Sequence, residues 1–107
     1  MKKLLFLCSQ NKLRSPTAET VFANIPDWEV RSAGLNHGAD IPLSKEDVEW
    51  ANYIFVMESA HKKKLQTKFR QSLKNQKVIC LNIPDNYQYM DEALVSIFRQ
   101  RIPQLVN

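Results

Sequence analysis

Short apolar runs alternate with amphipathic helical patterns along the chain, and this alternation constrains the fold more than any other feature. The first run, Leu4–Leu7, is continuous, as expected for a strand that is buried on both faces of a parallel sheet. Three further β-leaning runs lie at residues 28–31, 53–57 and 78–81. A repeated strand–helix order predicts an α/β fold, with helices on both faces of one parallel sheet.

Between the strands, apolar residues recur at the spacing of helices. We expect the first helix to open at Ser15, the second to be capped by Ser44 with Asp47 in a capping box, and the third to be capped by Ser59. The last helix should begin near Asp91, and Pro103 should kink or end it. The expected core stripes are Ala18, Val21, Phe22 and Ile25 in the first helix, and Leu94, Ile97, Phe98, Ile102 and Leu105 in the last.

The length and composition predict a single domain over residues 1–107. Two cysteines, Cys8 and Cys80, form no disulfide framework, which favours a reducing compartment. The apolar run near the N-terminus is four residues long, whereas a signal core needs roughly 7–15. No later run approaches the roughly 18 apolar residues of a membrane span. We therefore expect a cytoplasmic protein that does not associate with membranes.

The net charge of +4 arises from one basic segment, residues 62–77, which contains no acidic residue. A solvated helix and loop would explain such a segment. The alternative is a surface for an anionic partner, either a nucleic acid or an acidic protein segment. The basic residues are Lys62, Lys63, Lys64, Lys68, Arg70, Lys74 and Lys77.

The loop from Cys8 to Ser15 joins the first strand to the first helix, and ligands of parallel sheets bind at this edge. Such a loop aims backbone N–H groups inward beside the positive end of a helix dipole, which predicts an anion site. Arg14 adds a planar fork that suits two phosphate oxygens. In that field the thiolate of Cys8 is favoured, and Ser15 can donate a hydrogen bond to the sulfur. These residues predict a nucleophile that faces a phosphate site.

The stretch CSQNKLRSPTAE at residues 8–19 resembles the motif C-x-x-N-x-x-R-S-P-x-A-E of the low-molecular-weight protein tyrosine phosphatases. Two later stretches also resemble motifs of that family. RSAG at residues 31–34 resembles the S-A-G turn after the family's second strand, and IPDNY at residues 83–87 resembles the I-x-D-P-Y loop, which supplies the general acid. The expected fold is a three-layer α/β sandwich with a four-stranded parallel sheet in the order 2-1-3-4.

The resemblance implies a phosphatase that hydrolyses phosphotyrosine or a similar aryl phosphate, on a phosphorylated protein or a small ester, without a cofactor. It implies that Cys8 attacks phosphorus, Arg14 holds the phosphoryl oxygens, and Asp85 acts as general acid and then general base. Asp91 is the rival acid, although it can equally cap the last helix. The implied phosphate-binding residues are Ser9, Gln10, Asn11, Lys12, Leu13, Arg14 and Ser15.

The sequence departs from the family pattern at three positions. Gln10 replaces a glycine of many members, Leu13 replaces a second loop cysteine of some members, and Asn86 replaces the proline of D-P-Y. The cysteine that could protect Cys8 by a disulfide is therefore lacking at Leu13. The loop around Asp85 should also be less rigid, because proline fixes its backbone angle φ.

Several other side chains have ordinary structural interpretations. Cys80 is expected in the core, and His37 and His61 at the surface. These cysteines and histidines show no metal-ligand spacing. Tyr87 and Tyr89 could line a pocket for an aryl phosphate or pack the acid-bearing loop against the protein.

Two other functions remain open from the sequence. A thiol arsenate reductase has a similar loop, but that chemistry needs further cysteines, and only Cys80 remains. A non-catalytic phosphate-binding module, docking on nucleic acid through residues 62–77, is the second alternative. The presence of Cys8, Arg14 and Asp85 argues against it.

Overall fold

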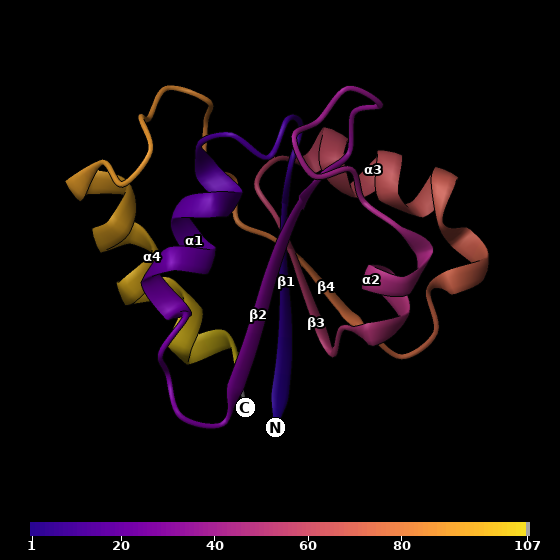
Figure 1. Ribbon diagram of the computed structural model, residues 1–107, viewed down its shortest axis with the longest axis horizontal. Coiled ribbons are helices and arrows are strands. Elements are labelled where there is room, and N and C mark those ends of the chain that lie inside the picture. The colour runs from indigo at the N-terminus through magenta and orange to yellow at the C-terminus, as the bar shows by residue number, and fades with distance from the viewer. Residues whose placement is uncertain (107) are drawn as a thin grey trace.

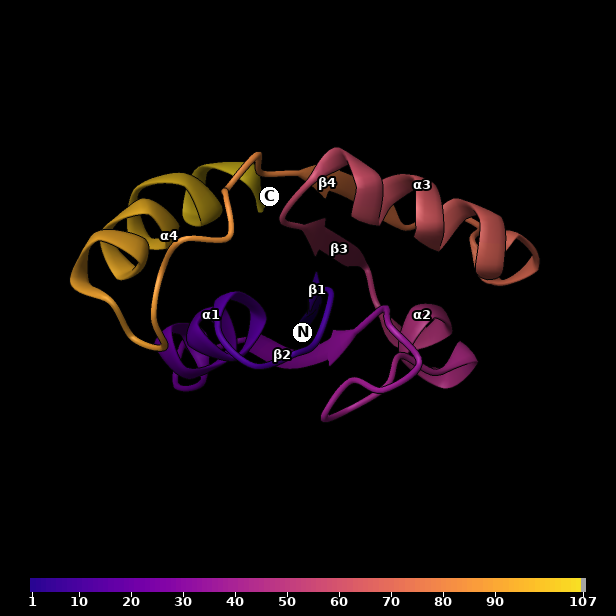
Figure 2. The ribbon, with the colours of Figure 1, turned by 90° about the horizontal axis from the view of Figure 1, so that it is seen from above.

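The computed structural model describes residues 1–106 and confirms the expected α/β fold and sheet order. The parallel sheet has the order β2-β1-β3-β4 and consists of β1 (Lys2–Cys8), β2 (Trp28–Gly34), β3 (Tyr53–Val56) and β4 (Lys77–Cys80). The helices are α1 (Arg14–Phe22), α2 (Lys45–Trp50), α3 (Ser59–Lys68) and α4 (Glu92–Leu105), with a 3₁₀ turn at Arg70–Ser72. Helices α1 and α4 cover one face of the sheet, and α2 and α3 cover the other (Figure 2).

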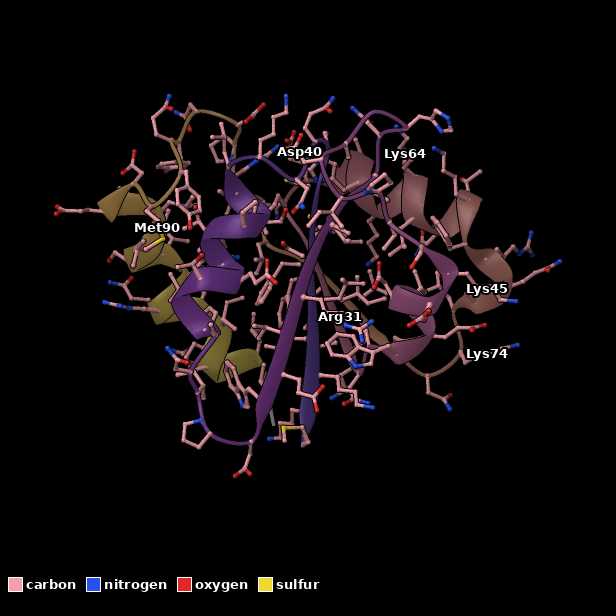
Figure 3. All side chains as sticks on the ribbon, viewed as in Figure 1. Arg31, Asp40, Lys45, Lys64, Lys74 and Met90 are labelled. Carbon is pink, nitrogen blue, oxygen red and sulfur yellow. The ribbon has the colours of Figure 1, made fainter. Side chains whose placement is uncertain are left out.

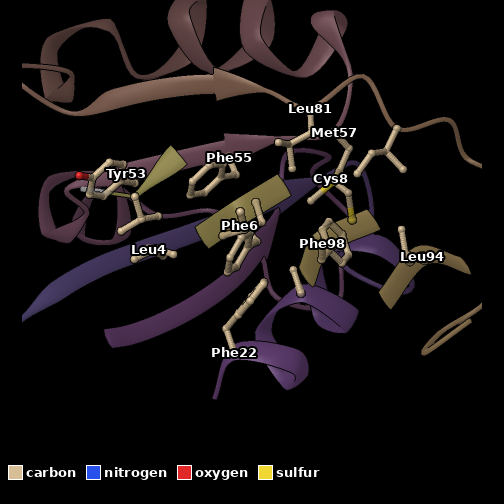
Figure 4. Close-up of a cluster of buried hydrophobic side chains, with 14 residues drawn as sticks. Leu4, Phe6, Cys8, Phe22, Tyr53, Phe55, Met57, Leu81, Leu94 and Phe98 are labelled. Atoms are coloured by element: carbon tan, nitrogen blue, oxygen red, sulfur yellow. The ribbon is translucent and has the colours of Figure 1, made fainter. Parts of the chain in front are cut away.

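Side chains of the central strand alternate between two cores, one on each face of the sheet. Leu4, Phe6 and Cys8 belong to the core beneath α1 and α4, whereas Leu5 and Leu7 belong to the core beneath α2 and α3. Figure 4 shows the first of these cores, which is rich in aromatic rings. All four residues 4–7 are fully buried, which explains why the first apolar run in the sequence is continuous.

Two helices begin earlier than expected. The first helix was expected to open at Ser15, with Pro16 as its first helical residue. Helix α1 instead has Leu13 as N-cap and starts at Arg14, because the carbonyl of Leu13 already accepts the N–H of Thr17 at 3.2 Å. It ends at Phe22, so Ile25 lies beyond the helix and is 39% exposed, contrary to the expected core stripe.

In α3, Glu58 rather than Ser59 is the N-cap residue. The carbonyl of Glu58 accepts the N–H of His61 at 3.0 Å, which begins the helical hydrogen bonding one residue early. The predicted caps of the other two helices are confirmed. Ser44 and Asp47 form the capping box of α2, and the carboxylate of Asp91 accepts the N–H of Ala93 at 2.9 Å in α4.

Helix α4 buries Leu94, Phe98 and Ile102 against the sheet, as its apolar stripe predicted. Pro103 lies inside the final turn, and the helix ends at Leu105. Among residues 1–106, no helix has the length and hydropathy that crossing a bilayer requires.

The carboxyl ends of the strands lie at one edge of the sheet, opposite the edge that holds the two chain termini (Figure 1). Gly34 ends β2 at this edge, paired with Cys8 of β1. A methyl group built on Gly34 would come within 2.4 Å of the Ala39 side chain and 2.8 Å of the Ser9 carbonyl oxygen. Glycine is therefore required for the segment after β2 to approach the loop after β1.

We expect Gly34→Ala to destabilise the protein, because the added carbon forces this close contact apart. The free energy of unfolding should fall by about 1–3 kcal/mol, as is typical of overpacking. Gly38→Ala is the matched control, since nothing lies within 4 Å of a carbon added there. Urea denaturation measures both variants, and equal stability of the two would contradict this account of Gly34.

Candidate active site

The loop from Cys8 to Ser15 is held by the segment that follows β2. Three successive carbonyl oxygens of the loop accept backbone N–H groups of residues 35–40, and this ladder fixes the loop's path. The three bonds are Leu35 N–H to Cys8 O at 2.9 Å, Asn36 N–H to Ser9 O at 2.9 Å, and Asp40 N–H to Gln10 O at 3.0 Å.

These bonds also orient the loop amides. In a trans peptide, the carbonyl of one residue and the N–H of the next point in opposite directions. Because the carbonyls of residues 8–10 point at segment 35–40, the N–H groups of residues 9–11 point away from it. Within residues 1–106, the amides of residues 9–13 donate to no protein acceptor. They stand beside the N-terminus of α1, as an anion site requires.

A hollow of about 110 Å³ opens at this loop. It has room for a tetrahedral anion, and it is smaller than the roughly 300–1,000 Å³ of pockets that take drug-sized ligands. The residues that line it are Cys8, Ser9, Gln10, Lys12, Leu13, Arg14 and Asp85.

Cys8 packs against the core beneath α1 and α4, and it also lines the hollow. The sulfur lies 2.9 Å from Ser15 Oγ, and Ser15 donates to Asn11 Oδ1 at 2.9 Å. A hydroxyl has a single hydrogen, so Ser15 serves either Asn11 or the sulfur. When the Ser15 hydroxyl donates its hydrogen bond to Asn11, the Cys8 thiol must be the donor to Ser15 Oγ. Once the thiol loses its proton, the hydroxyl can turn to the sulfur.

Asn11 shapes the loop in two ways. Its backbone has φ of 57°, a left-handed conformation that asparagine tolerates better than most residues. Its side chain is 5% exposed and accepts the bond from Ser15. Asn11 therefore supports both the turn of the loop and the hydroxyl beside the sulfur.

The guanidinium of Arg14 is 3% exposed and is held in a fixed orientation. Its Nη1 donates to Glu58 Oε2 at 2.6 Å and to the carbonyl of Ile83 at 2.7 Å. Both hydrogens of Nη1 are thereby used, which leaves the Nε and Nη2 edge without a hydrogen-bond partner among residues 1–106. Asp85 Oδ1 faces this edge, 3.7 Å from Nε. That edge is the geometry with which arginine binds two oxygens of one phosphate.

The two candidate acids lie in different surroundings. Asp85 lines the hollow, with Oδ1 at 3.7 Å from Arg14 Nε, and its side chain is 66% exposed. Asp91 caps α4 and is not among the residues that line the hollow.

Two residues of the site were missed or misjudged in the sequence. Glu58, which binds Arg14, directly follows the buried stretch that ends at Met57. This position at the carboxyl edge of the sheet could have indicated that Glu58 belongs to the site. His61 was expected at the surface, and this was wrong, because it is 5% exposed and its Nε2 lies 3.0 Å from Ser9 Oγ. The α3 N-cap at Glu58 turns His61 inward, since Glu58 N–H donates to its Nδ1 at 3.2 Å. Burial lowers the pKa of His61 below its ordinary 6.5, and the charge of Arg14 lowers it further.

Neither of the two tyrosines after Asp85 is among the residues that line the hollow. Tyr87 packs against the core beneath α1 and α4, and Tyr89 shares a 2.8 Å hydrogen bond with Thr20. The structure therefore favours the packing alternative over an aromatic pocket wall.

Cys80 is only partly buried, contrary to expectation, and its thiol donates to Asn82 Oδ1 at 3.3 Å. Its exposure arises because β4 is the edge strand of the sheet. It packs against the core beneath α2 and α3, whereas Cys8 belongs to the opposite core, so the sheet separates the two thiols. His37 is exposed, as predicted. Among the described residues, no three side chains of His, Cys, Asp or Glu gather as metal ligands would.

The chain was compared with known proteins. No model of a protein family matches it. A protein-arginine-phosphatase of Geobacillus stearothermophilus is 28% identical in a match that covers 65% of this chain and 64% of that protein. The chain thus matches somewhat less than two thirds of this relative's length.

Solved structures resemble the whole fold. An arginine phosphatase, YwlE, of Geobacillus stearothermophilus has a TM-score of 0.79 at 21% identity, covering 98% of this chain and 93% of that one. A low-molecular-weight protein tyrosine phosphatase of Streptococcus pyogenes also has a TM-score of 0.79, at 18% identity, covering 100% and 95%. A third, from T. tengcongensis, has a TM-score of 0.77 at 22% identity, covering 97% and 99%.

These similarities agree with the motif at residues 8–19 and with the sheet order. They confirm the resemblance inferred from the sequence: the chain has the fold of the low-molecular-weight protein tyrosine phosphatase family.

Proposed function

We propose that the protein is a cysteine-dependent phosphatase that hydrolyses phosphotyrosine or a similar aryl phosphate through a cysteinyl-phosphate intermediate. One observation carries the proposal. A single hollow of about 110 Å³ is lined by Cys8, by Arg14 with its guanidinium held in place, and by loop residues 9, 10, 12 and 13, whose amides have no protein acceptor. The reaction class follows from this arrangement of nucleophile and oxyanion donors.

In the first proposed step, the Cys8 thiolate attacks phosphorus. An S–P bond forms, the P–O bond to the leaving group breaks, and the departing oxygen takes a proton from Asp85. The loop amides and the free edge of Arg14 hold the equatorial oxygens. In the second step, water attacks phosphorus and gives a proton to Asp85. The electrons of the S–P bond return to the sulfur, which accepts a hydrogen bond from Ser15.

The position of Asp85 supports its role as the acid. Its carboxylate borders the hollow beside Arg14 Nε, within reach of an ester oxygen bound there. Asp91 has another use, because its carboxylate caps α4. We therefore assign the acid to Asp85.

Phosphoarginine is the second candidate substrate. One relative, 28% identical in its match, is a protein-arginine-phosphatase, and neither Tyr87 nor Tyr89 is among the residues that line the hollow. The same nucleophile would then break a P–N bond in place of a P–O bond.

The surroundings of Cys80 disfavour an arsenate reductase, whose chemistry relays oxidation to a second thiol. Cys80 and Cys8 pack into opposite cores. A reactive Cys8 also requires a reducing compartment, so we propose that the protein works in the cytoplasm.

We further propose that residues 62–77 bind acidic flanks of a phosphorylated protein substrate. The segment lies on the α2 and α3 side of the molecule, where Figure 3 labels Lys64 and Lys74. Exposed Lys63, Arg70 and Lys74 contribute to its charge. Lys64 donates to Asn36 Oδ1 at 2.6 Å, which connects the segment to residues 35–40 beside the phosphate loop. Charge of one sign on one face attracts an oppositely charged partner.

Replacement of the nucleophile tests the reaction class. Cys8→Ser should reduce turnover of p-nitrophenyl phosphate to background, because a serine hydroxyl is not ionised at neutral pH. Binding of inorganic phosphate, measured by titration calorimetry, should persist, since the amides and Arg14 remain. Substantial turnover by this variant would refute the thiolate mechanism.

The unaltered enzyme should then be assayed on matched peptides that carry phosphotyrosine or phosphoarginine at the same position. We expect the higher kcat/KM for phosphotyrosine. A clear preference for phosphoarginine would support the proposed phosphatase activity but contradict phosphotyrosine as its substrate.

Asp85→Asn should lower kcat about 10²–10⁴-fold for a phosphate ester with a poor leaving group, because such an oxygen needs the proton most. The loss should be much smaller for p-nitrophenyl phosphate. Asp91→Asn is the matched control, since asparagine caps a helix as well as aspartate does. A leaving-group dependence that appears with Asp91→Asn and not with Asp85→Asn would transfer the acid role to Asp91.

Reversing one charge tests the docking surface. Arg70→Glu should raise KM several-fold for an acidic phosphopeptide at low ionic strength, without changing KM for p-nitrophenyl phosphate. The effect should shrink in high salt, because exposed charges are screened. Arg99→Glu is the control, because Arg99 is an exposed residue of α4, and it should leave both KM values unchanged. An equal effect of the two variants would rule out a specific surface at residues 62–77.

A further inference from the structure

His61 is a buried histidine whose two ring nitrogens have different partners. Its Nδ1 lies 3.2 Å from the backbone nitrogen of Glu58, which can only donate. Nδ1 must therefore be the acceptor and carries no proton. In the neutral ring the proton is then on Nε2, which faces Ser9 Oγ at 3.0 Å.

The tautomer in turn decides what the Ser9 hydroxyl can do. Since Nε2–H of His61 donates, Ser9 Oγ accepts, and the hydroxyl hydrogen of Ser9 remains to be donated elsewhere. Ser9 lines the hollow, and its amide belongs to the set without a protein acceptor. Its hydroxyl is thus oriented as one more donor for an anion in the hollow.

We propose that His61 is a positioning residue, whose neutral ring holds the Ser9 hydroxyl so that its hydrogen is donated to an oxygen of the bound phosphoryl group. This inference rests on the proposed phosphatase function for its role in turnover. The tautomer and the binding of a phosphate anion depend only on the geometry.

The charges around His61 come from three parts of the chain. Arg14 of α1 and Lys64 of α3 disfavour its protonation, whereas Glu58 at the start of α3 and Asp85 after β4 favour it. Burial is the largest influence, and the net result is a pKa below 6.5, so the ring is neutral at pH 7.

Protonation would keep the Nε2–H bond to Ser9 but would disrupt the Glu58 side of the ring. A charged ring would point an Nδ1–H group at the Glu58 N–H, so that bond would be lost. Glu58 also holds Arg14 Nη1 at 2.6 Å, and its movement would release the guanidinium. Catalysis should therefore fall as the pH drops below the lowered pKa of His61.

Two substitutions separate the two bonds of the ring. Asparagine can place an acceptor near the position of Nδ1 but has no atom at Nε2, so His61→Asn removes the contact with Ser9. Glutamine can place a donor near the position of Nε2, so His61→Gln can keep that contact. His37→Gln is the matched control, because His37 is exposed on the segment after β2.

We expect His61→Asn and Ser9→Ala each to weaken inorganic phosphate binding and to lower kcat/KM for p-nitrophenyl phosphate by roughly tenfold, the effect of one hydrogen bond. The phosphate affinity and kcat/KM of the double variant should be no lower than those of the more impaired single variant, because both substitutions remove the same hydrogen-bond donor. His61→Gln should retain more activity than His61→Asn. His37→Gln should match the unaltered protein, including in the acid limb of its pH profile.

Nitrogen-15 NMR of the unaltered protein tests the tautomer directly and needs no variant to fold. At pH 7 we expect a proton on Nε2 and none on Nδ1. A protonated Nδ1, additive losses in the double variant, or phosphate binding by His61→Asn within twofold of the unaltered protein would overturn the proposal. If the unaltered protein binds phosphate and has the expected tautomer but lacks phosphatase activity, the proposed function fails while the donor role of His61 and Ser9 stands.

Discussion

The site depends on the backbone ladder between the loop after β1 and the segment after β2. By binding the carbonyls of residues 8–10, segment 35–40 turns the amides of residues 9–11 the other way. Without this ladder, the loop amides would have no fixed direction, and Cys8 would be an ordinary thiol at the end of a buried strand. The ladder requires a residue without a side chain at position 34, which connects one glycine to the geometry of the whole loop.

The buried guanidinium of Arg14 is the second constraint. A charge removed from water is costly unless partners compensate it. Glu58, Asp85 and the Ile83 carbonyl come from two further segments of the chain, so they bring the ends of β3 and β4 to the loop after β1. Since Nη1 alone takes the two short bonds, the opposite edge of the fork stays available. The same contacts that stabilise the fold thus leave Arg14 ready for an anion.

The sheet and the position of the loop that lines the hollow could be predicted from the sequence, because their signals are local. Continuous apolar strands and the C-x5-R-S pattern lie within single stretches, and the structure brings Cys8, Arg14 and Asp85 to one hollow. The contacts of His61 and Glu58 span 52 and 44 residues. The sequence could therefore indicate the position of Glu58 at the carboxyl edge, but neither its pairing with Arg14 nor the burial of His61. In the sequence, a histidine at the start of a lysine-rich helix resembles a surface residue. Only the structure shows that the cap at Glu58 turns His61 inward. Burial of Cys80 was overestimated for a similar reason, since strand order, and not strand composition, makes β4 an edge.

The location of the two thiols on opposite sides of the sheet has a consequence for damage by peroxides. A sulfenic acid formed on Cys8 could condense with another thiol and later be reduced, whereas further oxidation is irreversible. The only other cysteine in this sequence packs into the opposite core, and position 13 holds leucine. Recovery of an oxidised Cys8 therefore depends on small thiols that diffuse into the hollow from solution. In this architecture, the abundance of such reductants, rather than any internal disulfide, decides how long the Cys8 thiol survives oxidative stress.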